Sequence, residues 1–191
     1  HETIESCLNQ TYKNIEIIIS DDGSKDKTPE IIKRYAKKFP DRIIPVLHPV
    51  NTGIAENSNR GLKLATGDYI IWFGGDDIMK TERVEKQIKY LEEHTEYSAC
   101  YSDADVFEWP SGKEVGLFSH VYGSGTFEII DIKKYLHPEC VLLPSAIMFR
   151  RTAMQDRYVD ERIKMMNDYL FYAQLLIHGG PFGYLEESLI R

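Results

Sequence analysis

Apolar and polar positions follow two different periods along the first half of the chain. Continuous apolar runs lie at residues 15–20, 43–47 and 69–73. Runs of this length predict short strands that are buried on both faces, as in a parallel sheet. After Thr28, Gly53 and Thr81, apolar residues instead recur at helical spacing, and both threonines are suitable helix caps. Strands that alternate with helices predict an α/β fold with a doubly wound, mixed and mainly parallel sheet.

The second half contains the same kinds of elements at less regular spacing. The predicted strands are 97–107, 145–149 and 182–189, and the predicted helices are 132–136 and 169–177. Gly179 and Gly180 are expected to end the last helix. At 191 residues, the chain fits one domain of ordinary size.

The charge balance argues against a nucleic-acid partner. The chain has 23 Lys and Arg against 30 Asp and Glu, which gives a formal net charge of −7. Positive charge is scattered, except for a cluster formed by Lys33, Arg34, Lys37 and Lys38. A nucleic-acid backbone needs a basic patch or stripe, so this chain is a poor match. The helical spacing of the cluster favours a solvated helix face, and an anionic membrane surface is the alternative.

The cysteines suggest neither a disulfide framework nor a zinc site. Cys7, Cys100 and Cys140 are far apart and show no C-x-x-C spacing. They are compatible with a reducing cytoplasm. The apolar runs are much shorter than the roughly 20 residues that a membrane-spanning helix needs. We therefore expect a cytoplasmic location, which allows peripheral association with the inner face of the membrane.

Two acidic pairs stand directly after predicted strands. Asp21 and Asp22 follow the first apolar run, and Asp76 and Asp77 follow the third. In open parallel sheets, ligands bind at the carboxyl ends of strands, so we expect both pairs to face one crevice. Adjacent carboxylates repel each other and need a compensating cation, for which Mg²⁺ or Mn²⁺ suits hard oxygen ligands. The simpler reading is that these aspartates only form turns or cap helices.

A further carboxylate, Asp168, precedes the apolar helical run at 169–177. Taken alone, it is best explained as the N-cap of that helix.

The stretch 6–28 carries a family resemblance. It reads SCLNQTYKNIEIIISDDGSKDKT and is similar to the opening of family 2 glycosyltransferases, roughly S-x-L-x-Q-T-Y-x-N-x-E-I-I-V-x-D-D-G-S-x-D-x-T. Further matches follow in the order of the family at 51–53, 59–61, 65–70 and 76–78, with shorter ones at 145–151 and 167–169. The resemblance covers nearly the whole first half. It implies a GT-A fold and an inverting transferase that uses a nucleotide-diphosphate sugar.

The resemblance also implies a role for each matched residue. Asp22 would hydrogen-bond the nucleobase, Asp76 would lie against the ribose and diphosphate, and Asp77, with Asp76, would hold Mn²⁺ or Mg²⁺. Asp168 would be the general base that takes a proton from the acceptor hydroxyl. The matched motifs place Asp21 and Asn59 among the residues that bind the nucleotide sugar. Residues 1–95 would then form the nucleotide-sugar-binding half and residues 96–191 the acceptor-binding half of one domain.

Three departures from the family pattern bear on these roles. Gly74 replaces the first carboxylate of the usual D-x-D-D, so weaker metal binding is expected. Ser58 replaces an arginine that normally precedes the residue matched by Asn59, which removes a cation near the nucleotide. The first strand of the family is absent from these residues, because a helical pattern begins almost at once with Ile4, Cys7 and Leu8.

Other functions remain as alternatives. A response-regulator receiver also places an acidic pair after a buried strand. It needs a lone phosphoacceptor Asp at the end of its third strand and a Lys at the end of its fifth, and this sequence offers no convincing match for either. A sugar nucleotidyltransferase would show a Gly-rich phosphate loop after its first strand, which these residues do not include. A relative that binds the nucleotide sugar without turnover is the third alternative.

The resemblance also suggests the substrates. A UDP-sugar donor, a glycan or lipid-linked acceptor and a role in cell-surface polysaccharide synthesis are expected. The loops at 109–127 and 135–144 would choose the donor sugar and acceptor.

Overall fold

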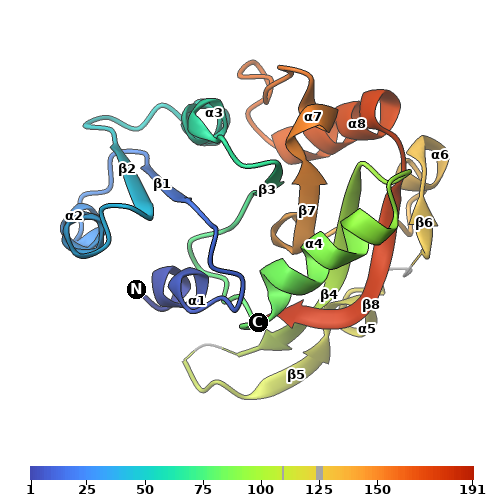
Figure 1. Cartoon of the computed structure of the whole chain (residues 1–191), viewed down its shortest axis with the longest axis horizontal. Helices are drawn as coiled ribbons and strands as arrows, with labels where there is room; N and C mark the ends of the chain where they lie inside the picture. Colours follow the sequence, from blue (N-terminus) through green and yellow to red (C-terminus); the bar gives the residue numbers. More distant parts are fainter. Residues whose placement is uncertain (109, 124–126) are drawn as a thin grey trace. The chain divides into compact units, whose positions relative to one another are not determined.

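The computed structural model describes residues 1–108, 110–123 and 127–191 (Figure 1). Parts of the loop expected to select substrates, residues 109 and 124–126, lie outside this description. The chain forms two compact units. The six-stranded unit contains residues 1–13, 68–155 and 173–191, and the β1–β2 unit contains residues 14–67 and 156–172. This division does not coincide with residue 95, the expected boundary between the nucleotide-sugar-binding half and the acceptor-binding half.

The β1–β2 unit repeats the strand-then-helix order that the apolar pattern predicts. Its elements are β1 (Ile17–Asp21), α2 (Thr28–Lys38), β2 (Ile43–Leu47) and α3 (Ile54–Leu64). The two strands pair in parallel, with Ile17 opposite Ile43. Helix α2 packs on both strands and α3 packs on β1. Residues 17–20 of β1 are only half-buried, whereas burial on both faces was expected, because β1 pairs with β2 alone among the described strands.

The six-stranded unit holds the larger sheet. Its strands are β3 (Tyr69–Ile71), β4 (Ala99–Phe107), β5 (Glu114–Leu117), β6 (Ile129–Ile130), β7 (Ile147–Arg150) and β8 (Phe182–Ile190). The order is β3-β7-β4-β8-β6, with β5 added on β4. Strands β4 and β8 are parallel, whereas β7 runs against both β3 and β4. The expected α/β class with a mixed sheet is confirmed, and the insertion of β7 between β3 and β4 makes antiparallel pairing frequent in this sheet.

Several helices also belong to this unit. They are α1 (Glu2–Leu8), α4 (Arg83–Glu93), α5 (Phe118–Val121), α6 (Ile132–Tyr135) and α7 (Arg151–Met154), together with the 3-10 turn η1 (Pro144–Ala146). Figure 1 shows α4 lying across β4 and β8. Leu91, Phe149 and Phe182 are fully buried. Each such side chain contributes about 1.5–3 kcal/mol of hydrophobic stabilisation.

Helix α8 (Asn167–Gly179) begins in the β1–β2 unit and ends in the six-stranded unit, since the boundary falls after Tyr172. It spans the predicted helix 169–177 and ends at the predicted glycines. No helix in the described ranges is both long and apolar enough to cross a bilayer.

The expected helix caps are wrong by one residue. Helix α2 has Lys27 at its N-cap, and Thr28 is already helical, because the Asp26 carboxylate accepts the Thr28 N–H at 2.9 Å. Helix α4 has Glu82 rather than Thr81 at its N-cap. Asp168 is likewise not the residue before a helix, since it lies in the first turn of α8.

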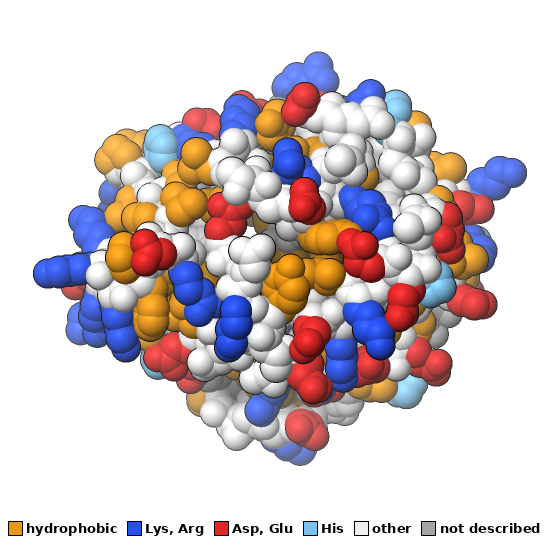
Figure 2. Space-filling model, in the orientation of Figure 1, with side chains coloured by type: hydrophobic (Ala, Val, Ile, Leu, Met, Phe, Trp, Pro, Cys, Tyr) orange, Lys and Arg blue, Asp and Glu red, His pale blue; other side chains and the backbone are white. Residues whose placement is uncertain are grey.

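The basic cluster at the end of α2 is exposed, as expected for a solvated helix face. Arg34 and Lys38 lie over the rings of Tyr35 and Phe39, which neighbour them in sequence. Figure 2 shows Lys and Arg side chains gathered at the left edge of the face drawn and interspersed with Asp and Glu elsewhere on it.

Candidate functional site

The loop after β3 carries the second acidic pair and is built around a glycine. A methyl group on Gly74 would lie 2.7 Å from Asp77 Oδ2 and 3.0 Å from Asp76 Oδ1. Both distances are shorter than an ordinary carbon–oxygen contact, so the two carboxylates occupy space that only a glycine leaves open. Gly74 thus allows the oxygens of Asp76 and Asp77 to approach the same point.

This cradle suits a small divalent cation that also binds phosphate. Mg²⁺ is usually held in proteins by one or two carboxylates, with water and substrate phosphates as the other ligands. Within the described residues, no group of three or more His, Cys, Asp or Glu side chains is gathered in this way. The Asp76 and Asp77 pair therefore fits a cation shared with a diphosphate better than a site closed by protein ligands.

The first acidic pair ends β1 in the β1–β2 unit, and its second member holds the start of α3. Asp22 accepts hydrogen bonds from the N–H groups of Thr52 and Gly53, at 3.0 and 2.7 Å, and from the Thr52 hydroxyl at 3.0 Å. Gly53 has a φ of 99°, a left-handed conformation that a residue with a side chain rarely adopts. Asp22 thus fixes the turn that leads into α3.

A guanidinium completes the surroundings of Asp22. Arg60 Nη1 lies 3.4 Å from Asp22 Oδ1, and Arg60 also pairs with Glu56. Burial raises the pKa of Asp22, but the hydrogen bonds from Thr52 and Gly53 and the charge of Arg60 outweigh it and hold the pKa below its usual value. A cation therefore stands beside this carboxylate even though Ser58 replaces the expected arginine.

Asp21 behaves as the turn-forming alternative anticipated. Its side chain is buried, and Oδ2 accepts the N–H of Ser24 at 3.2 Å. Its carbonyl oxygen accepts the N–H of His48 at 2.9 Å. Both contacts shape the loop after β1.

Asn59 lies on α3 and joins the two stretches of the β1–β2 unit. Its side-chain nitrogen donates to the Val159 carbonyl and to Glu161 Oε1, both at 2.9 Å, and its oxygen accepts the Val159 N–H at 2.9 Å. Asn59 is 3% exposed. Its amide is thus already engaged, and a direct contact with a nucleotide would require one of these bonds to be exchanged.

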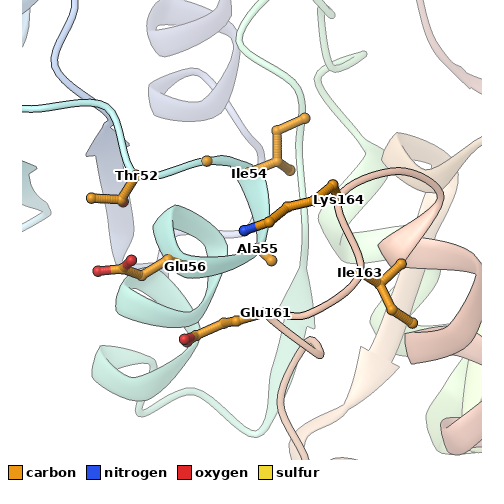
Figure 3. Close-up of a pocket in the computed structure, with 8 residues that line it drawn as sticks. Thr52, Ile54, Ala55, Glu56, Glu161, Ile163 and Lys164 are labelled. Carbon is orange, nitrogen blue, oxygen red and sulfur yellow. The ribbon is translucent and has the colours of Figure 1, made fainter.

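A cavity of about 210 Å³ opens beside these residues within the same unit. Its walls come from the start of α3 and the segment 156–166 (Figure 3): Thr52, Gly53, Ile54, Ala55, Glu56, Glu161, Ile163 and Lys164. Figure 3 shows the Lys164 side chain reaching from that segment toward α3. Thr52 and Gly53, which donate to Asp22, therefore also line the cavity.

Asp168 stands in the first turn of α8, where the helix dipole favours a negative charge. Met166, two residues earlier, adopts a left-handed φ of 53°, and Asn167 is buried. The chain therefore turns sharply before Asp168, which itself remains partly accessible.

The family model for glycosyl transferase family 2 matches residues 1–157. The chain belongs to this family. Among relatives of the family-2 chain, EpsE of Bacillus subtilis (strain 168), named as a glycosyltransferase, is 43% identical over 107 residues, covering 56% of this chain and 38% of EpsE. The matched part thus covers well under half the length of that relative.

Solved glycosyltransferase structures share the fold of this family-2 chain. TarS of S. aureus in complex with UDP-GlcNAc has a TM-score of 0.74 at 18% identity, covering 99% of this chain and 53% of that one. The mannosyltransferase PcManGT of Pyrobaculum calidifontis, in complex with GDP-Man and Mn²⁺, has a TM-score of 0.72 at 18% identity, covering 99% and 51%. The expected GT-A fold is therefore confirmed.

The family-2 site residues fall into two groups. Asp76 and Asp77 meet beside Gly74 in the six-stranded unit, whereas Asp22, Asn59 and Asp168 belong to the β1–β2 unit. The convergence of both groups on one cleft remains a prediction.

Several residues around these groups were not predicted from the sequence. Arg60 could have been identified from its position directly after Asn59 in the matched motif 59–61. Lys164 lies in no matched motif, and the family match at 145–151 did not indicate that Ser145 bonds to Gly74, because the two residues are distant in sequence.

Proposed function

We propose that this chain is the catalytic part of an inverting glycosyltransferase that moves a sugar from a nucleotide-diphosphate donor, a UDP-sugar, to an acceptor hydroxyl. The observation that supports this most directly is the Gly74 cradle, which holds the Asp76 and Asp77 carboxylates beside one point. Membership of the family supplies the reaction type. TarS was solved with UDP-GlcNAc and PcManGT with GDP-Man and Mn²⁺, and these complexes support a nucleotide-sugar donor and a divalent cation.

Each residue of the site then has a defined task. Asp76 and Asp77 hold Mn²⁺ or Mg²⁺, which when bound neutralises negative charge on the departing diphosphate. Asp22 fixes Thr52 and Gly53 against the cavity that takes part of the nucleotide.

Asp168 accepts the proton of the acceptor hydroxyl as that oxygen attacks the anomeric carbon from the side opposite the diphosphate. One displacement of this kind inverts the anomeric centre. We infer from the family resemblance that the acceptor is a glycan or lipid-linked sugar in cell-surface polysaccharide synthesis.

A donor screen by thermal shift tests the proposal. The chain is heated with UDP-, GDP- and TDP-sugars in the presence and absence of Mn²⁺, because a ligand that binds the folded state raises the melting temperature. We expect stabilisation by a UDP-sugar that depends on Mn²⁺ and is lost in Asp77→Ala. Stabilisation without turnover of the same donor, in the presence of a range of glycan acceptors, would instead support the binding-only alternative. No stabilisation by any donor would overturn the proposal.

A further inference from the structure

The antiparallel register of β3 and β7 brings Ser145 to the acidic loop. Tyr69 pairs with Arg150, Ile70 with Phe149 and Ile71 with Met148. Beyond the paired residues, Gly74 follows β3 and Ser145 lies in the turn η1 just before β7, and the Gly74 N–H donates to Ser145 Oγ at 3.0 Å. The pairing of β3 with β7 thus brings the loop of Gly74 next to the turn that carries the Ser145 hydroxyl.

Three oxygens surround the space beside Gly74. A methyl group there would lie 2.7 Å from Asp77 Oδ2, 3.0 Å from Asp76 Oδ1 and 3.3 Å from Ser145 Oγ. Ser145 is 6% exposed, so its hydroxyl is fixed inside the structure rather than moving in solvent. The hydrogen bond from Gly74 uses one acceptor position of this oxygen, and a hydroxyl oxygen has two.

We propose that Ser145 Oγ is a third protein oxygen of the cation site, beside Asp76 and Asp77. This inference rests on the proposed function, because it extends the same cation site. Hydroxyls of serine and threonine serve as ligands of Mg²⁺ in phosphate-binding loops. A neutral hydroxyl adds an oxygen without adding a third negative charge, which would otherwise repel the diphosphate.

Ser145 thus supplies an oxygen beside the space that Gly74 leaves open. The chain lacks the first acidic side chain of the family pattern at position 74, and the oxygen on this side of the site comes instead from Ser145 in the turn η1. A carboxylate at position 74 would have to displace the side chains of Asp76 and Asp77, since its Cβ would already crowd them.

Replacement of the hard oxygen by a soft sulfur tests direct contact with the cation. Thiolate ligands favour soft metals, whereas hydroxyl and carboxylate oxygens favour Mn²⁺. Mn²⁺ and Cd²⁺ are titrated separately into the complete chain and into Ser145→Cys, with binding followed by calorimetry. We expect the preference for Cd²⁺ over Mn²⁺ to rise by about tenfold or more.

Ser102→Cys is the matched control, because Ser102 is also buried and bonds to the backbone but lies on β4. Its metal preference should equal that of the unmodified chain, which itself contains three cysteines. An unchanged preference in Ser145→Cys, or an equal change in Ser102→Cys, would overturn the inference. A purely structural role of Ser145 would alter stability without altering the choice of metal.

Two further variants separate the possible failures. Ser145→Ala should fold and bind Mn²⁺ about tenfold more weakly, as expected for the loss of one neutral oxygen at a metal site. Unchanged Mn²⁺ affinity in Ser145→Ala would contradict the inference even if Ser145→Cys does not fold. Asp77→Ala tests the cation site of the proposed function itself: if it abolishes Mn²⁺ binding while the Ser145 variants do not alter it, only the role of Ser145 fails.

Discussion

Asn59 and Val159 close on each other through two hydrogen bonds of 2.9 Å, one in each direction between the Asn59 amide and the Val159 backbone. The arrangement imitates the exchange of N–H and C=O between paired strands. It connects helix α3 to a segment that the chain reaches only after passing through the six-stranded unit. Asn59, which the family pattern associates with the nucleotide sugar, thus also joins α3 to the segment 156–166. These two segments form the walls of the cavity.

Asn59→Ala should destabilise the protein by about 2–3 kcal/mol, because it leaves the buried N–H and C=O of Val159 without partners. Urea unfolding at neutral pH measures this loss. Asn57→Ala is the control, since Asn57 lies on the same helix and bonds to Ser20, away from Val159. A smaller effect for Asn59→Ala than for Asn57→Ala would contradict the role of Asn59 as a fastening.

Gly74→Ala should weaken Mn²⁺ binding with little loss of stability. The added methyl would meet Asp77 Oδ2 at 2.7 Å, and this flexible side chain can swing away at small cost but then leaves the cation site. Gly75→Ala is the control, because nothing lies within 4 Å of the space its methyl would fill. Titration of both variants with Mn²⁺ checks the expectation, and equal affinities would show that the cradle does not hold the cation.

Asp22→Asn should destabilise the protein at neutral pH and have less effect in acid. The folded-state pKa of Asp22 lies below its usual value, so its stabilising contribution is complete above the unfolded pKa of about 4 and is lost as the pH falls through the folded pKa. The expected loss at pH 7 is about 1–3 kcal/mol, in the range for hydrogen bonds to a charged group. Urea unfolding at pH 7 and pH 3 gives the difference. A gap between variant and parent that widens toward pH 3 would be the wrong sign for this carboxylate.

Asp168→Asn should abolish sugar transfer while leaving donor and metal binding intact. The amide cannot accept the acceptor proton, and general-base catalysis contributes about 10²–10⁴-fold to rate. Transfer from the donor found in the thermal-shift screen, measured alongside donor affinity, provides both readouts. Loss of donor affinity equal to the loss of rate would place Asp168 in binding rather than in proton transfer.

Local pattern was enough to predict most elements, and β2 was predicted residue for residue because its apolar run has clear polar ends. Strand β5 was missed because three of its four residues are exposed and carry no apolar pattern. The N-cap of α2 was predicted one residue too late. The Asp26 carboxylate accepts the backbone N–H of Thr28, and Thr28 is already helical.

The acidic residues of the site were easier to predict than the residues that surround them. Asp76 and Asp77 were visible as a pair, but the place of Ser145 depends on its hydrogen bond with Gly74, which joins residues 71 positions apart. The engagement of Asn59 with Val159 depends on a contact between residues 100 positions apart. No periodicity or local motif encodes either distance.

The two units are interleaved in sequence, and this affects the exchange of segments between related proteins by recombination. Residues 14–67 and 156–172 form one unit although 88 residues of the other unit separate them in sequence. A recombination event that transferred only residues 14–67 would bring Asn59 without the Val159 backbone to which it bonds. The walls of the Figure 3 cavity can therefore be inherited intact only when both stretches are transferred together.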